Sequence, residues 1–476
     1  MDNLTLERIK NDLSHWTASK RRKDQLNGER YYDGIHDILT REREVIGRNG
    51  EIETVDNLPN NRIVDNQYKK LIKQKTNYIA GRPLTISGKD KRYVEALKNI
   101  FDKRFMRTFK NAVKNSMETG ICWMFPYFDS TGALRFKLIS GSQLMPYWAD
   151  DEHTEVTRGV RLFEQKAYET ATSTTPRIIT KCEIYDADGI YSFTYRENSL
   201  IPDNGGDNLI PYAVAADSGK GYNWNRVPLI PVKYNEDETP LINMVKCLQD
   251  GLNMLISDFE NNMQEDCRNT IMVLKNFDGE NLGEFRKNLA TFGAVKVRSG
   301  DGGDAGVETL QITVNSDNYK AILDLFKKSI IENGMGYDAK DDRLSGTPNQ
   351  LNIRSMYSDI DLDANDMETE LQAALQDMLW FVDSYLMSIG VGSYFDTPVD
   401  FIFNRDILIN ESQVISDIRS SEGILSRKTL VEQHPYVDDV EEEMRRIAQE
   451  EQEEQKKLGY DPFDTDDDDK GGDDGE

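Results

Sequence analysis

Acidic residues at alternate positions near residue 360 are the strongest candidates for chemistry in this sequence. Five oxygen-bearing side chains have the spacing of positions 1, 3, 5, 7 and 12 of a calcium-binding EF-hand loop: Asp359, Asp361, Asp363, Asn365 and Glu370. The glycine that such a loop needs at position 6 is Ala364, and a continuous helical pattern there spreads alternate carboxylates over different faces. We therefore expect a structural helix rather than a calcium site, and favour a two-metal nuclease site on the three aspartates less still.

No other motif predicts catalysis, a metal or a cofactor. The sequence has no GxxxxGK[ST] phosphate loop, and the glycine-rich stretch 300–306 lies between two predicted strands, which favours a hairpin tip. The four histidines are not at metal-ligand spacing: His15, His36, His153 and His434. The four cysteines lie far apart, which predicts reduced, buried thiols: Cys122, Cys182, Cys247 and Cys267.

Length and hydropathy narrow the class of protein. A chain of 476 residues is long enough for about three structural units with a large core. No apolar run approaches the roughly 18 residues that span a bilayer, and the first residues lack the apolar core of a secretory signal. We expect a protein that folds in the cytosol.

Charge is distributed unevenly along the chain. The formal net charge is -26, but residues 1–120 carry +8, residues 121–429 carry -20 and residues 430–476 carry -14. The basic run 20–23 is more typical of a solvated helix face than of a phosphate contact. An acidic excess argues against wrapping of DNA, since affinity for phosphate comes mostly from lysine and arginine, but it is compatible with a DNA conduit.

Hydrophobic periodicity predicts an α+β fold. Helices are expected over 1–32, 61–80 and 91–117, followed by an antiparallel β region over 122–195 with turns at 129–132 and 186–189. Two amphipathic helices, 241–263 and 319–333, bracket a small α/β module with strands near 270–274, 294–297 and 308–314 and a helix near 282–290. A polar loop over 334–348 precedes a long helix, 349–388, and a strand, 399–403. Three helices, 412–421, 427–433 and 440–457, then precede an acidic tail.

The order of these parts and three local motifs resemble the portal proteins of tailed bacteriophages, in the family of the SPP1 type. Asn61-Arg62-Ile63-Val64-Asp65, leading to Gly81-Arg82-Pro83, is similar to the family's early helix with its Gly-x-Pro end. Ser345-Gly346-Thr347-Pro348 resembles the turn before the family's long helix, and 426–439 resembles its crown segment. The long helix departs from the family by being acidic after Leu362.

The resemblance implies the family's architecture and function. Portal proteins form rings, usually of twelve subunits, around a channel that passes double-stranded DNA into and out of the capsid. They dock the large terminase, head-completion proteins, and the capsid and scaffold proteins, and they have no enzymatic activity or cofactor. The implied parts of this chain are a wing (1–235 and 349–410), a first stem helix (236–266), a clip (267–315), a second stem helix (316–334), a tunnel loop (335–348) and a crown (411–457). The acidic, glycine-rich composition of the remaining residues, 458–476, predicts a disordered tail.

The resemblance also implies positions for DNA and subunit contacts. Lys340 and Arg343 in the tunnel loop become phosphate contacts, limited by Asp338, Asp341 and Asp342; an exposed mixed-charge loop is the alternative. Acidic walls would repel the duplex and keep it centred, so Asp250 and Asp258 are candidates for the channel face, with an ordinary solvated face as the alternative. The stripe Leu241, Val245, Leu248 and Leu252 is expected to pack between subunits or in the subunit's own core.

Two other functions remain open from the sequence. One is a metal-dependent nuclease that uses Asp359, Asp361 and Asp363. The other is a virion or host scaffold with a similar body but no channel. We expect the portal subunit at the capsid vertex of the virion, after assembly in the host cytoplasm.

Overall fold

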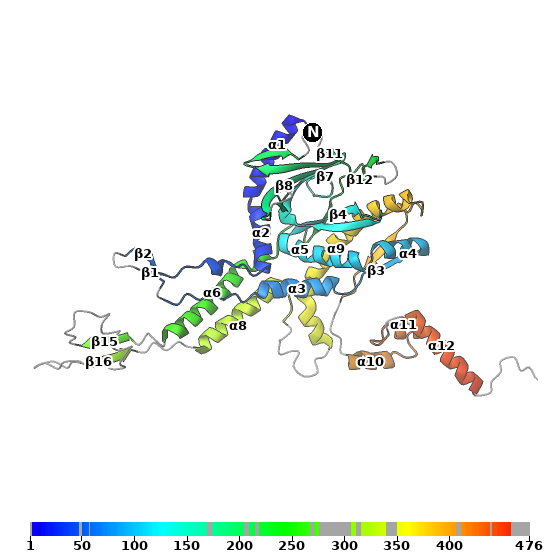
Figure 1. The fold of residues 1–476 in the computed structure, drawn as a ribbon. Coiled ribbons are helices and arrows are strands. Elements are labelled where there is room, and N and C mark those ends of the chain that lie inside the picture. The colour runs from blue at the N-terminus through cyan, green and yellow to red at the C-terminus, as the bar shows by residue number, and fades with distance from the viewer. Residues whose placement is uncertain are drawn as a thin grey trace, which may run out of the picture. The chain divides into compact units, whose positions relative to one another are not determined.

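Most strands lie in one block of the chain, from β4 (Ile121–Phe128) to β14 (Ile230–Lys233), with α-helices before and after it, which gives the mixed α+β fold that the periodicity predicts (Figure 1). The computed structural model describes residues 2–46, 50–56, 58–168, 174–203, 209–214, 219–266, 271–275, 306–310, 316–338, 350–405, 411–437 and 440–457. The chain divides into two units. One comprises Met1–Asp338 and Asp359–Asp406, and the other Ala339–Ser358 and Ile407–Glu476.

The first 32 residues form two helices, α1 (Asn3–Ala18) and α2 (Lys20–Tyr32), separated by Ser19. The Ser19 hydroxyl accepts a hydrogen bond from the Arg22 amide and so caps α2. The basic run 20–23 therefore begins a helix, and two of its members contact protein: Arg21 pairs with buried Glu238, and Arg22 donates to the carbonyl of Ser142. A short 3-10 helix, η1 (Asp37–Thr40), and the hairpin β1 (Glu44–Ile46) and β2 (Ile52–Thr54) follow.

Two antiparallel sheets form the body of the first unit. The larger has the order β10-β9-β8-β7-β6, with β11 also on β9, and the smaller has the order β14-β4-β5. The larger consists of β6 (Leu144–Trp148), β7 (Val156–Ala167), β8 (Arg177–Asp186), β9 (Gly189–Arg196), β10 (Ser199–Pro202) and β11 (Leu209–Ile210). The smaller consists of β4 (Ile121–Phe128), β5 (Leu134–Ile139) and β14 (Ile230–Lys233). Both predicted hairpin turns are confirmed, since β4–β5 and β8–β9 pair across them.

Alternating side chains build a core on each face of the large sheet. Ile184 and Cys182 of β8 face Ile9 and Leu13 of α1, whereas Tyr185 packs with the aromatic residues of β4 between the two sheets. The opposite face of β4 packs on α5 (Lys103–Thr119), where the Cys122 thiol lies 3.2 Å from the Ala112 carbonyl oxygen. The layers are therefore α1, the large sheet, the small sheet and α5.

Local caps divide what the periodicity predicts as longer helices. The predicted helix 91–117 is two helices, α4 (Lys91–Ile100) and α5, because Asp102 accepts hydrogen bonds from the amides of Arg104 and Phe105 and starts a new helix. The predicted helix 61–80 is wrong in its first turns: α3 (Gln67–Ala80) begins only after Asn66, which caps it.

The later helices of the first unit lie close to their predicted bounds. They are α6 (Ile242–Asp266), α8 (Ser316–Asn333) and α9 (Gln350–Ser388), whose first nine residues belong to the second unit. Helices α6 and α8 lie side by side (Figure 1). Between them, β15 (Ile271–Lys275) pairs with β16 (Gly306–Leu310). The predicted helix 282–290 and strand 294–297 lie outside the described residues.

Two further strand pairs complete the first unit. β17 (Val399–Ile402) pairs with β3 (Thr85–Gly88), and β12 (Ala213–Val214) with β13 (Gly221–Tyr222). A 3-10 turn, η2 (Gly141–Gln143), links β5 to β6. No helix among the described residues is both long and apolar enough to cross a membrane.

Besides the start of α9, the described residues of the second unit form three helices near their predicted positions: α10 (Glu411–Ser420), α11 (Arg427–Glu432) and α12 (Val440–Lys457). Ser426 caps α11 by accepting a hydrogen bond from the Thr429 amide, as its residue type predicts. The acidic tail, 458–476, lies outside the described residues.

The cysteines are only partly as predicted. Cys122 and Cys182 are buried free thiols, and burial raises the pKa of both. Cys247 is exposed, contrary to the prediction, because it lies on the face of α6 that the core of this chain does not cover. Cys267 lies outside the described residues.

A buried carboxyl group lies where α2 crosses α5. Gly28 permits the crossing: a Cβ there would lie 1.8 Å from the Glu118 carbonyl oxygen. The Glu118 side chain is only 3% exposed and takes hydrogen bonds or ion pairs from Asn115 and Lys114. Burial raises the pKa of Glu118 from 4.5 to about 7, despite Lys114 and Asn115, and the charge of Glu29 adds to the rise.

Glu118 therefore makes stability depend on pH. The folded protein keeps this proton between pH 4.5 and about 7, so the contribution is greatest below pH 4.5 and is lost as pH rises to about 7. We expect Glu118→Gln to raise the unfolding free energy at pH 8 by up to about 3 kcal/mol, and by little at pH 4.5. Urea titrations at both pH values measure this, with exposed Glu95→Gln as control. An equal effect of Glu118→Gln at both pH values would contradict the assignment.

Candidate functional site

Helix α6 carries a row of four buried polar side chains at intervals of four residues. Gln249, Asn253, Ser257 and Asn261 are all 0% exposed, and we call this row the α6 ladder. Residues four apart lie along one ridge of a helix. A fully buried row of amides and a hydroxyl needs hydrogen-bonding partners, since an unpaired buried polar group costs about 1–3 kcal/mol.

The partner of the ladder is the extended segment 61–66 with the first residues of α3. Asn261 accepts the Asn61 amide at 2.7 Å, and Ser257 accepts the Ile63 amide at 3.0 Å. Asn253 then accepts the Asp65 amide at 3.0 Å. Gln249 accepts the amides of Gln67 and Tyr68 at 3.0 and 3.1 Å. Alternate backbone amides of one segment are thus paired by every fourth side chain of the other.

Three of the four ladder side chains, Gln249, Asn253 and Ser257, are held in one orientation by their other contacts. The Gln249 amide nitrogen donates to the Asp65 carbonyl and to Asn253 Oδ1, at 2.8 and 3.0 Å. The Ser257 hydroxyl donates to the Asn253 carbonyl at 2.7 Å. The donors and acceptors of these three side chains are therefore used in a single arrangement, which fixes the position of α6 along the segment.

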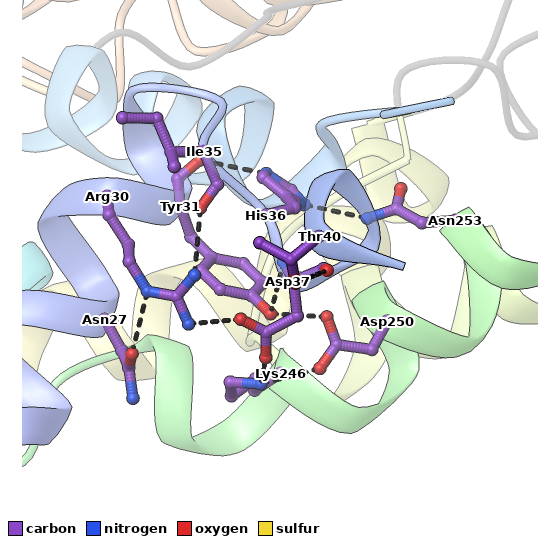
Figure 2. Close-up of polar contacts among 10 residues, drawn as sticks. All are labelled: Asn27, Arg30, Tyr31, Ile35, His36, Asp37, Thr40, Lys246, Asp250 and Asn253. Atoms are coloured by element: carbon purple, nitrogen blue, oxygen red, sulfur yellow. Dashed lines mark hydrogen bonds and ion pairs between the residues drawn. The ribbon is translucent and has the colours of Figure 1, made fainter. Parts of the chain in front are cut away.

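A second group of contacts holds the N-terminal half of α6 against the end of α2 and η1 (Figure 2). Tyr31 donates to Asp250 at 2.5 Å, and Lys246 lies 2.7 Å from Asp250 and 2.5 Å from Asp37. Arg30 also pairs with Asp37. Burial alone would raise the pKa of Asp37, but hydrogen bonds from Lys246 and Arg30 lower it to about 2.

His36 connects this group to the ladder. Its Nε2 lies 3.0 Å from the Tyr31 carbonyl oxygen, so Nε2 carries the proton and Nδ1 accepts from the Asn253 amide nitrogen at 2.8 Å (Figure 2). Protonation of Nδ1 would place its N–H donor against the N–H donor of the Asn253 amide. Burial lowers the pKa of His36, which favours the same neutral form.

Helix α9 is attached to the body by the aspartates that resemble an EF-hand. Asp363 lies 2.7 Å from buried Lys75 and accepts from Tyr234 at 2.6 Å, and Asp361 accepts from Tyr78. Arg405 also pairs with Asp361, at 3.4 Å. The continuous helix through this stretch is confirmed. Of the acidic residues after Leu362 that distinguish this helix from the resembled family, Asp363 and Glu368 pair with cations of the same chain, Lys75 and Arg405.

The structure distributes the other predicted site residues as follows. Asp250 and Asp258 both have cationic partners in the same chain, with Arg41 and Arg43 at 2.7 and 3.8 Å from Asp258. Leu241, Val245 and Leu252 are 0% exposed within one chain and Leu248 is half-buried, as core packing requires. Asp338 is described, whereas Lys340, Asp341, Asp342 and Arg343 lie outside the described residues. Their roles toward DNA or a neighbouring subunit stay predictions.

Sequence reasoning missed the α6 ladder, although the signal was present. The apolar stripe, which recurs every three or four residues, is enough to predict α6, and the polar row runs beside it at intervals of four residues. A row of Gln, Asn, Ser and Asn in an amphipathic helix indicates side chains that form buried hydrogen bonds, since charged residues would normally occupy a solvated face.

The ladder makes a specific prediction about stability. Asn253→Leu removes the acceptor for the Asp65 amide and the partners of Gln249 and His36, so we expect the unfolding free energy to fall by about 2–4 kcal/mol. Asn243→Leu, an identical change at an exposed position of the same helix, should cost less than about 1 kcal/mol. Urea titration of both variants measures the difference, and similar losses would contradict a dominant role for the ladder.

Comparison with known proteins identifies the family. The sequence matches the family described as "Phage portal protein, SPP1 Gp6-like" over residues 10–457. It is 27% identical to the portal protein of Bacillus phage SPP1 over 433 residues, covering 89% of this chain and 83% of that protein. It is 23% identical to the portal protein of Clostridium phage phiCD119 over 478 residues, covering 96% of this chain and 99% of that protein. This chain, with its helix pair α6 and α8 around an inserted segment, belongs to the SPP1 Gp6-like family of phage portal proteins.

Proposed function

We propose that this chain is the subunit of a portal ring at one vertex of the capsid, through which double-stranded DNA is packaged and ejected. The observation that carries the proposal is the family match over residues 10–457, which includes both central helices, the segment between them and the C-terminal helices. The chain acts without catalysis or a cofactor, and a separate terminase subunit supplies ATP hydrolysis. The ring also docks head-completion proteins and contacts the capsid and scaffold proteins.

The parts of the ring follow the family's order. Helices α6 and α8 form the stem, residues 267–315 the clip that meets the terminase, and residues 335–348 the tunnel loop. The wing comprises 1–235 and 349–410, and the crown comprises 411–457. In this assignment the α6 ladder and the contacts around Asp250 attach the first stem helix to the wing at several points, so that forces on the stem pass into a large folded body.

Exposed apolar side chains on the stem helices support assembly with other copies. Met254 and Met263 of α6 are 50% and 49% exposed, and Ile322 and Leu325 of α8 are 42% and 60% exposed. Several such residues on a helix pair are typical of a surface that another chain covers. The buried stripe, Leu241, Val245 and Leu252, instead serves the core of the subunit.

The acidic excess of the chain supports a role in passing DNA through a channel. Tight contacts of lysine or arginine with every phosphate would hold the duplex in place, whereas an acidic excess weakens binding and favours movement. In the tunnel loop, Lys340 and Arg343 touch phosphates and the neighbouring aspartates limit their hold. Asp250 and Asp258 contribute negative potential, reduced by Lys246, Arg41 and Arg43.

The ring is tested by its mass. Size-exclusion chromatography with light scattering, followed by negative-stain imaging, should show a particle with a central hole. Twelve chains of 54.5 kDa give about 650 kDa. A monomer or dimer at all protein and salt concentrations would contradict the proposal.

A charged substitution tests whether the exposed surface of α6 lies in an interface between subunits. We expect Met254→Glu to shift the large particle toward monomer, because assembly would bury an unpaired carboxylate. The melting temperature should change by less than about 3 °C, since the side chain is exposed in one chain. Ile178→Glu, a similar change at a 60% exposed position of β8, is the control and should leave the particle intact. Equal behaviour of the two variants would remove α6 from the interface.

A further inference from the structure

The exposed faces of α3 and α5 are strongly basic in an acidic protein. Residues 67–119 contain 14 basic and four acidic residues, a net charge of +10, in a chain whose net charge is -26. Helix α3 has no acidic residue. The only acidic residue within α5 is Glu118, whose side chain is buried.

Six cationic side chains of the two helices form one surface, which we call the α3/α5 face. They are Lys69, Lys70 and Lys73 of α3 and Arg107, Lys110 and Lys114 of α5. Helices α3 and α5 pack against each other, and two contacts join their outer edges.

Those two contacts show that the face is continuous. Lys110 donates to Asn77 Oδ1 at 2.6 Å. Nearer the start of α3, the Tyr32 ring lies between Lys69 and Lys114, whose ammonium groups are 4.8 and 4.4 Å from its centroid. Cations therefore line the neighbouring edges of both helices, with the Tyr32 ring between Lys69 and Lys114.

Few carboxylates neutralise this face. Glu118 binds Lys114 at 3.1 Å, and Asp102 caps α5 and pairs with Arg135 instead. Across the ranges given above for the structure, Lys70, Lys73 and Arg107 form no ion pair. Such a concentration of like charge is unfavourable by itself and favours a polyanionic partner.

The remote acidic charge of the chain does not cancel this attraction. At 0.15 M salt the screening length is about 8 Å, so charges on other parts of the surface contribute little at the face. From Arg107 to Lys114, α5 rises about 10 Å, the axial length of about three phosphates of one DNA strand. Flexible lysines on such a row suit phosphates and carry no base specificity.

We propose that the α3/α5 face binds the phosphate backbone of double-stranded DNA, at a site separate from the tunnel loop. The choice of DNA over an acidic protein segment rests on the proposed function, because DNA is the polyanion that a portal subunit meets. The face gives the protein a place to hold DNA that is not moving through the channel. Binding there is independent of sequence and strongly dependent on salt.

The test uses a fluorescently labelled, covalently closed duplex circle and the full-length protein. A closed circle cannot thread a closed ring, so anisotropy reports binding outside the channel. We expect the wild type to bind at 50 mM salt and to weaken steeply toward 200 mM. Lys73→Glu/Arg107→Glu should bind at least about tenfold more weakly at 50 mM salt, with a salt slope smaller by about two.

The control carries the same change in charge on another surface. Lys166→Glu/Lys220→Glu replaces two exposed lysines, of β7 and of the loop before β13, and should change affinity less than about twofold. Melting temperature and particle mass are measured for each protein. No binding of the circle by the wild type, or equal weakening in both variants, overturns the proposal.

An acidic partner is a distinguishable outcome. Binding of polyglutamate but not of the circle, lost in Lys73→Glu/Arg107→Glu, would assign the face to an acidic protein segment and overturn the DNA proposal. If the particle is monomeric, the ring fails while the circle measurement still reports on the face. If the ring forms and the circle does not bind, only the proposal that the α3/α5 face binds DNA is overturned.

Discussion

The match between the repeat of a helix and the repeat of an extended chain is the constraint on which this structure depends. Four residues of helix rise about 6.0 Å, or about 6.7 Å along the inclined row that they form, and two residues of extended chain span about 6.6 Å. The α6 ladder can therefore pair with alternate amides of segment 61–66 over its whole length without losing register. Because α6 also packs on α8, this register positions both central helices.

Ion pairs attach the other long helix by a different principle. Asp363 of α9 meets a lysine that is 2% exposed, and such a buried pair is costly to break because the remaining charge has no partner. Burial alone lowers the pKa of Lys75, and Asp363 opposes the shift by favouring the charged form. The α6 ladder binds segment 61–66 through neutral side chains, whereas α9 is attached through charged ones. The two attachments therefore respond differently to salt and pH.

Local signals predicted most elements and failed where distant residues decide the structure. The apolar stripes of α6, α8 and α9 are sufficient to predict these three helices, and the capping residue Ser426 predicts the start of α11. The spacing of Ile63 and Val64 predicts a helix over residues 61–66, yet the amides of this segment pair with side chains about 190 residues away, which no local window contains. The break at Asp102 was visible as a capping residue. The aspartates of α9 were correctly placed in a helix, but their lysine and tyrosine partners emerge only from tertiary packing.

The sequence separation of the ladder has a consequence for how the chain is made. Asn61 and Asn261 are 200 residues apart, so at 5–20 residues per second the ribosome needs about 10–40 s to supply the partner of a segment already synthesised. During that interval the amides of 61–66 are available to any exposed strand edge. The charged and polar residues in this segment, Asn61, Arg62, Asp65 and Asn66, oppose such pairing while the nascent chain waits for α6.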